Sequence, residues 1–310
     1  MSIRSDNALN EALKLIENCN FNQSLELLKD ILACELDDKR LVYAIRCCDF
    51  WKDCTNDNMN QLSFFEQGEW LLGQWKKFQV LIELAAPECE KTCYSFKKGI
   101  FSKALECYSR ANDEKDPKFK AEILRKTGLC YKKLGSYEMA LRFLTESNTL
   151  IGGQSQVLAE MADCYAFYGE TKNAKMLFRE AFYMDAQKID LSFLDSPLIR
   201  VLVEKVEDAG YTGAALLEWI PVYGVILGIF NVKRPLRSQE VLKLKQEIYS
   251  REGELKDPVK NRELLEPHLI NLYFWLIDYY VLTKDNVSKI NEIMLKLKLN
   301  FPEIYELFVK

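Results

Sequence analysis

The chain has 310 residues, a length that suits two domains or one extended array better than a single compact core. Hydrophobic residues (48%) and charged residues (28%) occur as in ordinary globular proteins, which excludes a disordered or fibrous chain. The 42 basic and 46 acidic side chains leave a net charge of −4, and this balance argues against sequence-independent binding to nucleic acid. Only 13 Gly and 8 Pro are present, which predicts an all-α fold of long helices joined by short turns.

The cysteines predict reduced thiols rather than disulfides or a metal site. The sequence starts without an apolar signal stretch, so we expect a cytoplasmic protein in a reducing compartment. The closest cysteine sets are Cys47 and Cys48 with Cys54, and Cys89 with Cys93. Neither set has the paired CxxC spacing that is typical of zinc sites, so we expect no metal. The thiols are expected to pack as small apolar residues.

The N-terminal region, residues 1–84, is predicted to be helical. Residues 7–35 indicate a helix hairpin whose second helix carries Phe21, Ser24, Leu28 and Ile31. Residues 41–84 indicate two further helices. The second of these covers about 62–84 and carries Phe64, Phe65, Trp70, Trp75 and Phe78.

Residues 85–116 predict a degenerate helix hairpin. Its first helix is expected over about 88–96. Its second helix carries an apolar pattern made of Gly99, Phe101, Ala104, Tyr108 and Ala111.

An internal repeat follows, with a period of 34 residues. Residues 121–154 and 155–188 match at eight positions when one segment is moved onto the other. The matched pairs are Leu124 and Leu158, Gly128 and Ala162, Cys130 and Cys164, Tyr131 and Tyr165, Gly135 and Gly169, Ala140 and Ala174, Leu144 and Phe178, and Ser147 and Ala181. Each unit reads as a helix hairpin in which a Gly ends the first helix and small residues lie where the two helices cross. One hairpin cannot bury both of its faces, so neighbouring hairpins are expected to stack.

This spacing resembles the tetratricopeptide repeat (TPR). The signature positions are occupied twice, by Leu124, Gly128, Tyr131, Gly135, Tyr137, Ala140 and Leu144, and by Leu158, Ala162, Tyr165, Gly169, Ala174, Phe178 and Ala181. The usual closing Pro is replaced by Gly152 in one unit and by Ala186 in the other. The resemblance implies a right-handed superhelical solenoid with degenerate flanking repeats. Its core would cover 85–189.

The C-terminal region, 190–310, carries two apolar segments. The first, 214–230, is interrupted by Glu218 and Pro221 and is too short for a typical membrane span. We expect it to pack against the repeats. A contact with a membrane or a partner is the alternative, through Trp219, Tyr223, Ile226 and Ile229. The second segment, 269–282, reads as a core helix or an interface and begins a degenerate repeat over 271–304.

Catalytic motifs are not found in the sequence. The single His, His268, cannot supply more than one imidazole to a catalytic set, and no Gly-rich phosphate-binding loop occurs. We therefore predict a non-enzymatic protein without a cofactor or metal.

The function that the sequence favours is protein binding. In the solenoid that the TPR resemblance implies, the first helices line a concave groove, and the expected partner-binding residues are Arg125, Leu129, Lys132, Lys133, Asp163 and Phe167. The partners would be proteins or peptide segments. The alternative is an accessory subunit of a membrane-bound bacterial assembly, of the flagellar-motor or secretion type, docking through 214–236.

Overall fold

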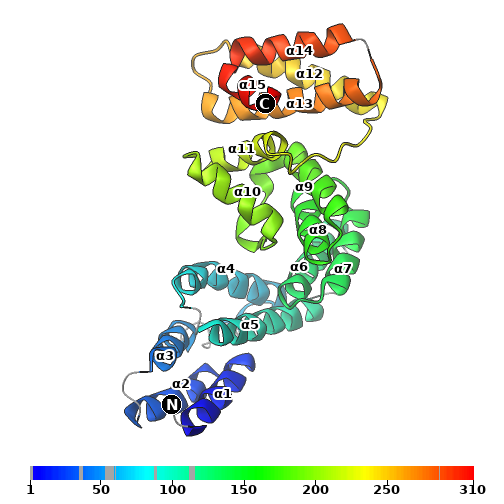
Figure 1. Ribbon diagram of the computed structural model, residues 1–310. Helices are drawn as coiled ribbons and strands as arrows, with labels where there is room; N and C mark the ends of the chain where they lie inside the picture. Colours follow the sequence, from blue (N-terminus) through cyan, green and yellow to red (C-terminus); the bar gives the residue numbers. More distant parts are fainter. Residues whose placement is uncertain are drawn as a thin grey trace. The chain divides into compact units, whose positions relative to one another are not determined.

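A computed structural model describes residues 3–34, 38–52, 59, 61–86, 89–111, 116–285 and 287–310, without the side chains of 3–5 and 34 (Figure 1). The described chain is all-α, as predicted: it forms fifteen α-helices and contains no strand. It divides into two compact units, residues 1–151 and 152–310. The border falls three residues before the junction of the two clear repeats. The predicted division at 84 and 189 stays a prediction.

Unit 1 is a stack of helices around an aromatic core. Its helices are α1 (Ile3–Glu17), α2 (Phe21–Cys34), α3 (Lys39–Lys52), α4 (Phe64–Glu83), α5 (Glu90–Arg110), α6 (Pro117–Lys133) and α7 (Tyr137–Leu150). Phe21 stacks on Phe96, and Phe78 contacts both Phe96 and Trp51. These rings join α2, α3, α4 and α5, so the N-terminal helices share one core with the helices that precede the first clear repeat.

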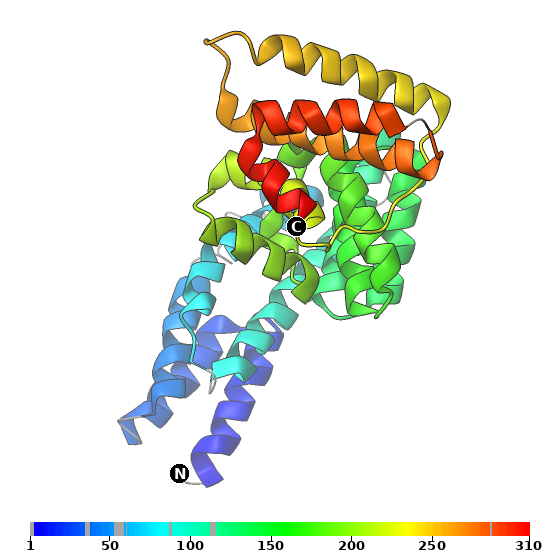
Figure 2. The ribbon, with the colours of Figure 1, turned by 45° about the horizontal axis from the view of Figure 1, so that its top comes forward.

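The C-terminal half of unit 2 contains three helices that lie alongside one another, α12, α13 and α14, and α15 follows them (Figure 2). The helices of the unit are α8 (Ser155–Phe167), α9 (Thr171–Asp185), α10 (Pro197–Asp208), α11 (Gly213–Ile226), α12 (Ser238–Glu254), α13 (Arg262–Leu282), α14 (Val287–Asn300) and α15 (Pro302–Val309). The predicted 269–282 helix lies within α13 and is buried over most of its length, so it belongs to the core of the unit.

Three hairpins, α1–α2, α6–α7 and α8–α9, repeat the same four positions. The first position is a small residue on the first helix. Counted from it, a residue with a left-handed backbone follows at +7, a second small residue at +12 and a large apolar residue at +16. The sets are Ala12, Cys19, Ser24 and Leu28; Gly128, Gly135, Ala140 and Leu144; and Ala162, Gly169, Ala174 and Phe178. The small and large apolar members are all buried. The helices therefore cross closely at the small pair.

The turn between these paired helices is also the same in each hairpin. Cys19, Gly135 and Gly169 have φ values of 59°, 82° and 83°. In each turn the N–H of the left-handed residue donates to the carbonyl three residues earlier. The next N–H donates to the carbonyl five residues before it. This is the Schellman pattern that ends a helix, and it confirms the predicted roles of Gly135 and Gly169.

The prediction of a helix hairpin over 85–116 is wrong in one respect. The two expected helices form one continuous helix, α5. Gly99 does not interrupt α5. It allows close approach to α1, since a Cβ at this position would lie 2.6 Å from the carbonyl oxygen of Ile16. The helix that pairs with α5 is α4. A Cβ at Gly68 would lie 2.5 Å from the ring of Tyr108, so these helices also cross at a small residue.

Two glycine substitutions test this packing. A Cβ at Gly128 would lie 2.7 Å from Leu144 Cγ, whereas a Cβ at Gly73 in α4 would meet nothing within 4 Å. Gly128→Ala should lower the free energy of unfolding by about 1 to 3 kcal/mol through overpacking. Gly73→Ala should raise it by about 0.5 to 1 kcal/mol through helix propensity. Urea unfolding of both variants measures the difference, and equal effects would contradict the close crossing.

Candidate functional site

The groove positions of α6 lie inside the folded chain. Leu129 is fully buried, and Lys132 and Lys133 are 3% and 6% exposed. The expectation that these side chains are open to a partner is therefore corrected. Helix α6 packs against both α5 and α7, and ten of its seventeen residues are buried, these three among them.

Arg125 belongs to an internal charge network of unit 1. Its guanidinium donates to Glu122, and Lys126 Nζ lies 2.8 Å from an oxygen of Glu69. Burial opposes ionisation of Glu122, but the hydrogen bond and charge of Arg125 outweigh burial and lower the pKa of that carboxyl. Glu69 also accepts from the hydroxyl of Tyr108 at 2.7 Å. The network joins α4, α5 and α6, which gives Arg125 a structural partner.

The groove face of α8 is occupied by the chain itself. Asp163 is fully buried, and its carboxylate accepts from the backbone N–H groups of Asp195 and Ser196 at 3.1 and 2.8 Å. Gln156, two turns nearer the start of α8, accepts from the N–H of Asp190 at 2.6 Å. Segment 186–196 thus lies along α8 where a bound peptide was expected. Asp163 is a structural residue, and the expectation that it contacts a partner is corrected.

Phe167 is the groove residue that stays at the surface. It is the last residue of α8, and its side chain is 37% exposed. The groove residues are therefore not brought together as one open site.

Asp163→Ala tests the role of the filled groove. Loss of the carboxylate would remove the acceptor of the buried N–H of Ser196 and of the partly buried N–H of Asp195, so the free energy of unfolding should fall by about 2 to 4 kcal/mol. Glu207→Ala, at an exposed position of α10, is the control and should change it by less than about 0.5 kcal/mol. Chemical denaturation measures both. A small effect at position 163 would mean that segment 186–196 is held by other contacts.

The apolar segment 214–230 forms α11 and the turn after it, and most of it is core. Trp219 is 7% exposed and stacks on Tyr211, while Ile220 and Val222 are fully buried. Three of the proposed docking residues, Tyr223, Ile226 and Ile229, are half-buried. No helix in the described ranges is long and apolar enough to cross a membrane.

The basic residues that follow this segment are held by carboxylates of unit 2. Lys233 Nζ lies 2.6 Å from Asp278, and Arg234 pairs with Glu180 and Glu240 at 2.6 and 2.8 Å. Arg234 also lies over the ring of Trp275. The linker between α11 and α12 is therefore fastened to α9, α12 and α13.

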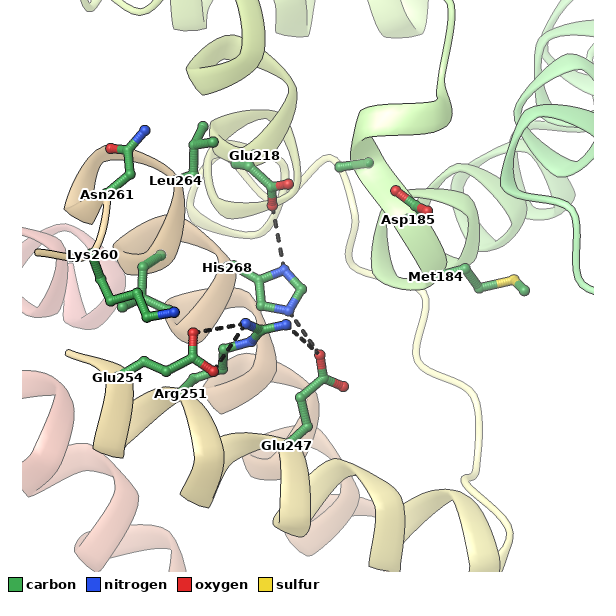
Figure 3. Close-up of a pocket in the computed structure, with 12 residues that line it drawn as sticks. Met184, Asp185, Glu218, Glu247, Arg251, Glu254, Lys260, Asn261, Leu264 and His268 are labelled. Carbon is green, nitrogen blue, oxygen red and sulfur yellow. Dashed lines mark hydrogen bonds and ion pairs between the residues drawn. The ribbon is translucent and has the colours of Figure 1, made fainter. Parts of the chain in front are cut away.

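An open cleft of about 410 Å³ in unit 2 surrounds His268, the residue that the sequence singled out (Figure 3). The imidazole lies between two carboxylates: Nε2 is 2.9 Å from Glu247, and Nδ1 is 3.4 Å from Glu218. Arg251 forms ion pairs with both Glu247 and Glu254. These residues come from α11, α12 and α13, so the charges join three helices.

His268 carries a proton at neutral pH. Burial disfavours its charged form, but the hydrogen bonds and negative charges of Glu218 and Glu247 outweigh burial and raise its pKa to about 9. An imidazolium with both nitrogens engaged cannot accept a proton, so the arrangement does not provide a general base. The positive charge of His268 on α13 pairs with Glu218 on α11 and Glu247 on α12, and so holds the three helices together.

Substitution of His268 should produce a pH-dependent loss of stability. Because the folded pKa lies above the ordinary value of 6.5, the stabilisation is fully present below pH 6.5 and is lost as pH rises through 9. His268→Gln should lower the melting temperature by several degrees at pH 6, and the difference should shrink by pH 10. Calorimetry across this range measures it. A difference that stays constant with pH would show that the imidazole charge is not involved.

Neither the residues that the structure describes nor the comparisons with known proteins point to a particular chemistry. In the part of the chain that the structure describes, no group of three or more His, Cys, Asp or Glu could hold a metal ion. No protein-family model matches the sequence, and no curated protein matches it. The TPR resemblance therefore remains an interpretation of the repeat pattern.

The surface of α12 and α14 carries apolar side chains that the sequence analysis missed. Helix α14 buries Ile293 and Leu297 on one face and exposes Leu295 (55%) and Leu299 (72%) on the opposite face. Lys296 Nζ lies 3.0 Å from Glu252 and joins α14 to α12. On α12, Leu242 and Tyr249 are 60% and 81% exposed. The two pairs, Ile293 with Leu297 and Leu295 with Leu299, were visible in the sequence as a helix that is apolar on both sides.

Proposed function

We propose that the protein is a non-enzymatic scaffold that binds other proteins, built as a TPR-like solenoid of stacked helix hairpins. Support comes from the four shared positions and the shared Schellman turn in α1–α2, α6–α7 and α8–α9. Hairpins of one register stack into extended surfaces, and such surfaces serve recognition more often than catalysis.

The binding surface in this proposal is the outer face of α12 and α14, defined by Leu242, Tyr249, Leu295 and Leu299. The observation that carries it is that α14 has two apolar faces and only one is covered within the chain. The last helices of a helical stack normally present a polar face to water. An exposed apolar face at this position is therefore typical of a surface that binds a partner.

The partner in this proposal is an amphipathic helix of another protein. Leu295 and Leu299 lie one turn apart, as do the anchor residues with which a bound helix meets its groove. Beside Leu299, a cavity of about 480 Å³ lies at the ends of α12 and α14 and is lined also by Leu255 and Phe301. Six of its nine lining residues are charged or polar, so it suits a partner side chain with an apolar stem and a charged end, such as Lys or Arg. Protein docking through α11 is less well supported, because α11 is mostly buried.

The test uses the full chain with a photo-cross-linking amino acid in place of Tyr249, expressed in its native cell. The cross-linked protein is identified by mass spectrometry. Leu295→Ser combined with Leu299→Ser should reduce its yield by about tenfold or more, since apolar anchors dominate binding energy. The control is Val80→Ser combined with Leu84→Ser, two exposed residues with the same spacing on and just after α4.

Both double variants should keep the helicity and melting temperature of the parent, because all four side chains are exposed. Cross-linking that survives in the Leu295 and Leu299 variant would reject this surface. Equal loss in both variants would mean that general surface hydrophobicity, not this face, is responsible.

A further inference from the structure

Helices α12 and α14 run in the same direction along the binding surface. Lys245 on α12 and Lys289 on α14 face one ring, that of Tyr280, with Nζ atoms 5.3 and 5.7 Å from its centre. Seven residues further along both helices, Lys296 Nζ lies 3.0 Å from Glu252. A partner helix laid along this surface would therefore pass from the Lys245 end to the Glu252 end.

The first end of the binding surface presents a cation. Lys245 is exposed and lies three residues after Leu242 and four before Tyr249, two of the residues that define the surface. Among the described residues, Lys245 forms no ion pair, and its ammonium group rests near the Tyr280 ring. An acidic side chain of a partner can therefore pair with Lys245 without displacing a carboxylate of the chain.

The other end of the binding surface leads to the cavity of about 480 Å³, where a carboxylate is left over. Glu266 is half-buried, lines this cavity, and forms no hydrogen bond or ion pair through its side chain within the described ranges. The second lining carboxylate, Glu252, is already engaged by Lys296 and by the Tyr273 hydroxyl at 2.7 Å. Glu266 is thus the carboxylate that an incoming cation would meet.

Two cations, Lys256 and Arg262, line the same cavity, but both are exposed to water. Arg262 donates to the carbonyl of Leu255 at 3.3 Å rather than to Glu266. An ion pair between exposed side chains contributes little, because water already solvates both charges. A half-buried carboxylate has lost part of its water, so it gains more from a cation that also donates hydrogen bonds. The cavity therefore favours a basic side chain of the partner over an acidic one.

We propose that the partner helix places a Lys or Arg against Glu266 and an Asp or Glu beside Lys245. This inference rests on the proposed function and adds a charge pattern to the partner. Lys245 and the cavity residue Leu255 are separated along α12 by a rise of about 15 Å, or roughly three helical turns. The two charges of the partner would therefore lie on one face, about eleven positions apart. Acidic residues stabilise the start of a helix and basic residues its end, so the partner helix would run parallel to α12.

The experiment measures the binding of synthetic helical peptides to the full chain by fluorescence anisotropy. The parent peptide, of about 18 residues, carries a stripe of leucine, a Glu in its first turn and a Lys three turns later. A second peptide has Gln in place of the Lys, and a third has Gln in place of the Glu. We expect the parent peptide to bind with a Kd about threefold or more below that of either other peptide.

Two variants of the chain assign each preference to its residue. Glu266→Gln should abolish the preference for Lys and keep the preference for Glu, whereas Lys245→Gln should have the opposite effect. The matched control is Glu263→Gln, which changes an exposed carboxylate of α13 that does not line the cavity, and it should keep both preferences. Circular dichroism should show the helicity of the parent in all three variants.

A preference for Lys that survives in Glu266→Gln would overturn this inference and leave the binding surface in place. Peptide binding that persists in the Leu295→Ser and Leu299→Ser double variant would reject the surface itself, and the inference with it. If no peptide binds although the cross-linked partner is lost in that double variant, the charge pattern is wrong and the proposed function stands.

Discussion

The close crossing of paired helices at small residues is the constraint on which much of the structure depends. At Gly128 even a methyl group would overlap Leu144, while the equivalent position in α8 accepts the methyl group of Ala162. In the hairpin of α1 and α2 the equivalent residue is Ala12, and the small residue on the second helix, equivalent to Ala140 and Ala174, is Ser24. Its hydroxyl is satisfied at the crossing because it donates to the carbonyl of Ala12 at 3.0 Å. Each hairpin thus tolerates a different small residue, provided that the axes stay close.

The local pattern predicted the hairpins because helix ends and crossings are short-range features. Gly135 and Gly169 adopt the left-handed turn that their position indicated. Cys19 adopts the same turn without the freedom of glycine, which is why the N-terminal hairpin looked weaker in the sequence. The continuous helix α5 was missed because Gly99 was given the role of a helix start. Its actual role, close contact with α1, involves residues more than eighty positions away.

The candidate site was predicted less well, because exposure depends on what the rest of the chain covers. Lys132 and Asp163 occupy groove positions, yet both are buried. Nothing within their own repeats indicates this. Segment 186–196 lies outside the 34-residue pattern, and its contact with Asp163 is tertiary. The apolar segment 214–230 packs in the core as expected, and charges following it are paired with carboxylates from three other helices.

The contact between segment 186–196 and α8 also sets the limits of modularity in the chain. A typical array can grow by insertion of a hairpin between two others, because each hairpin contacts only its neighbours. Here the residues that follow α9 return to α8, and Gln156 and Asp163 hold their backbone. An extra hairpin placed after α9 would carry this segment away from its acceptors. The array therefore has a stop at this point, and duplication of repeats within the gene could lengthen the protein before α8 but not directly after α9.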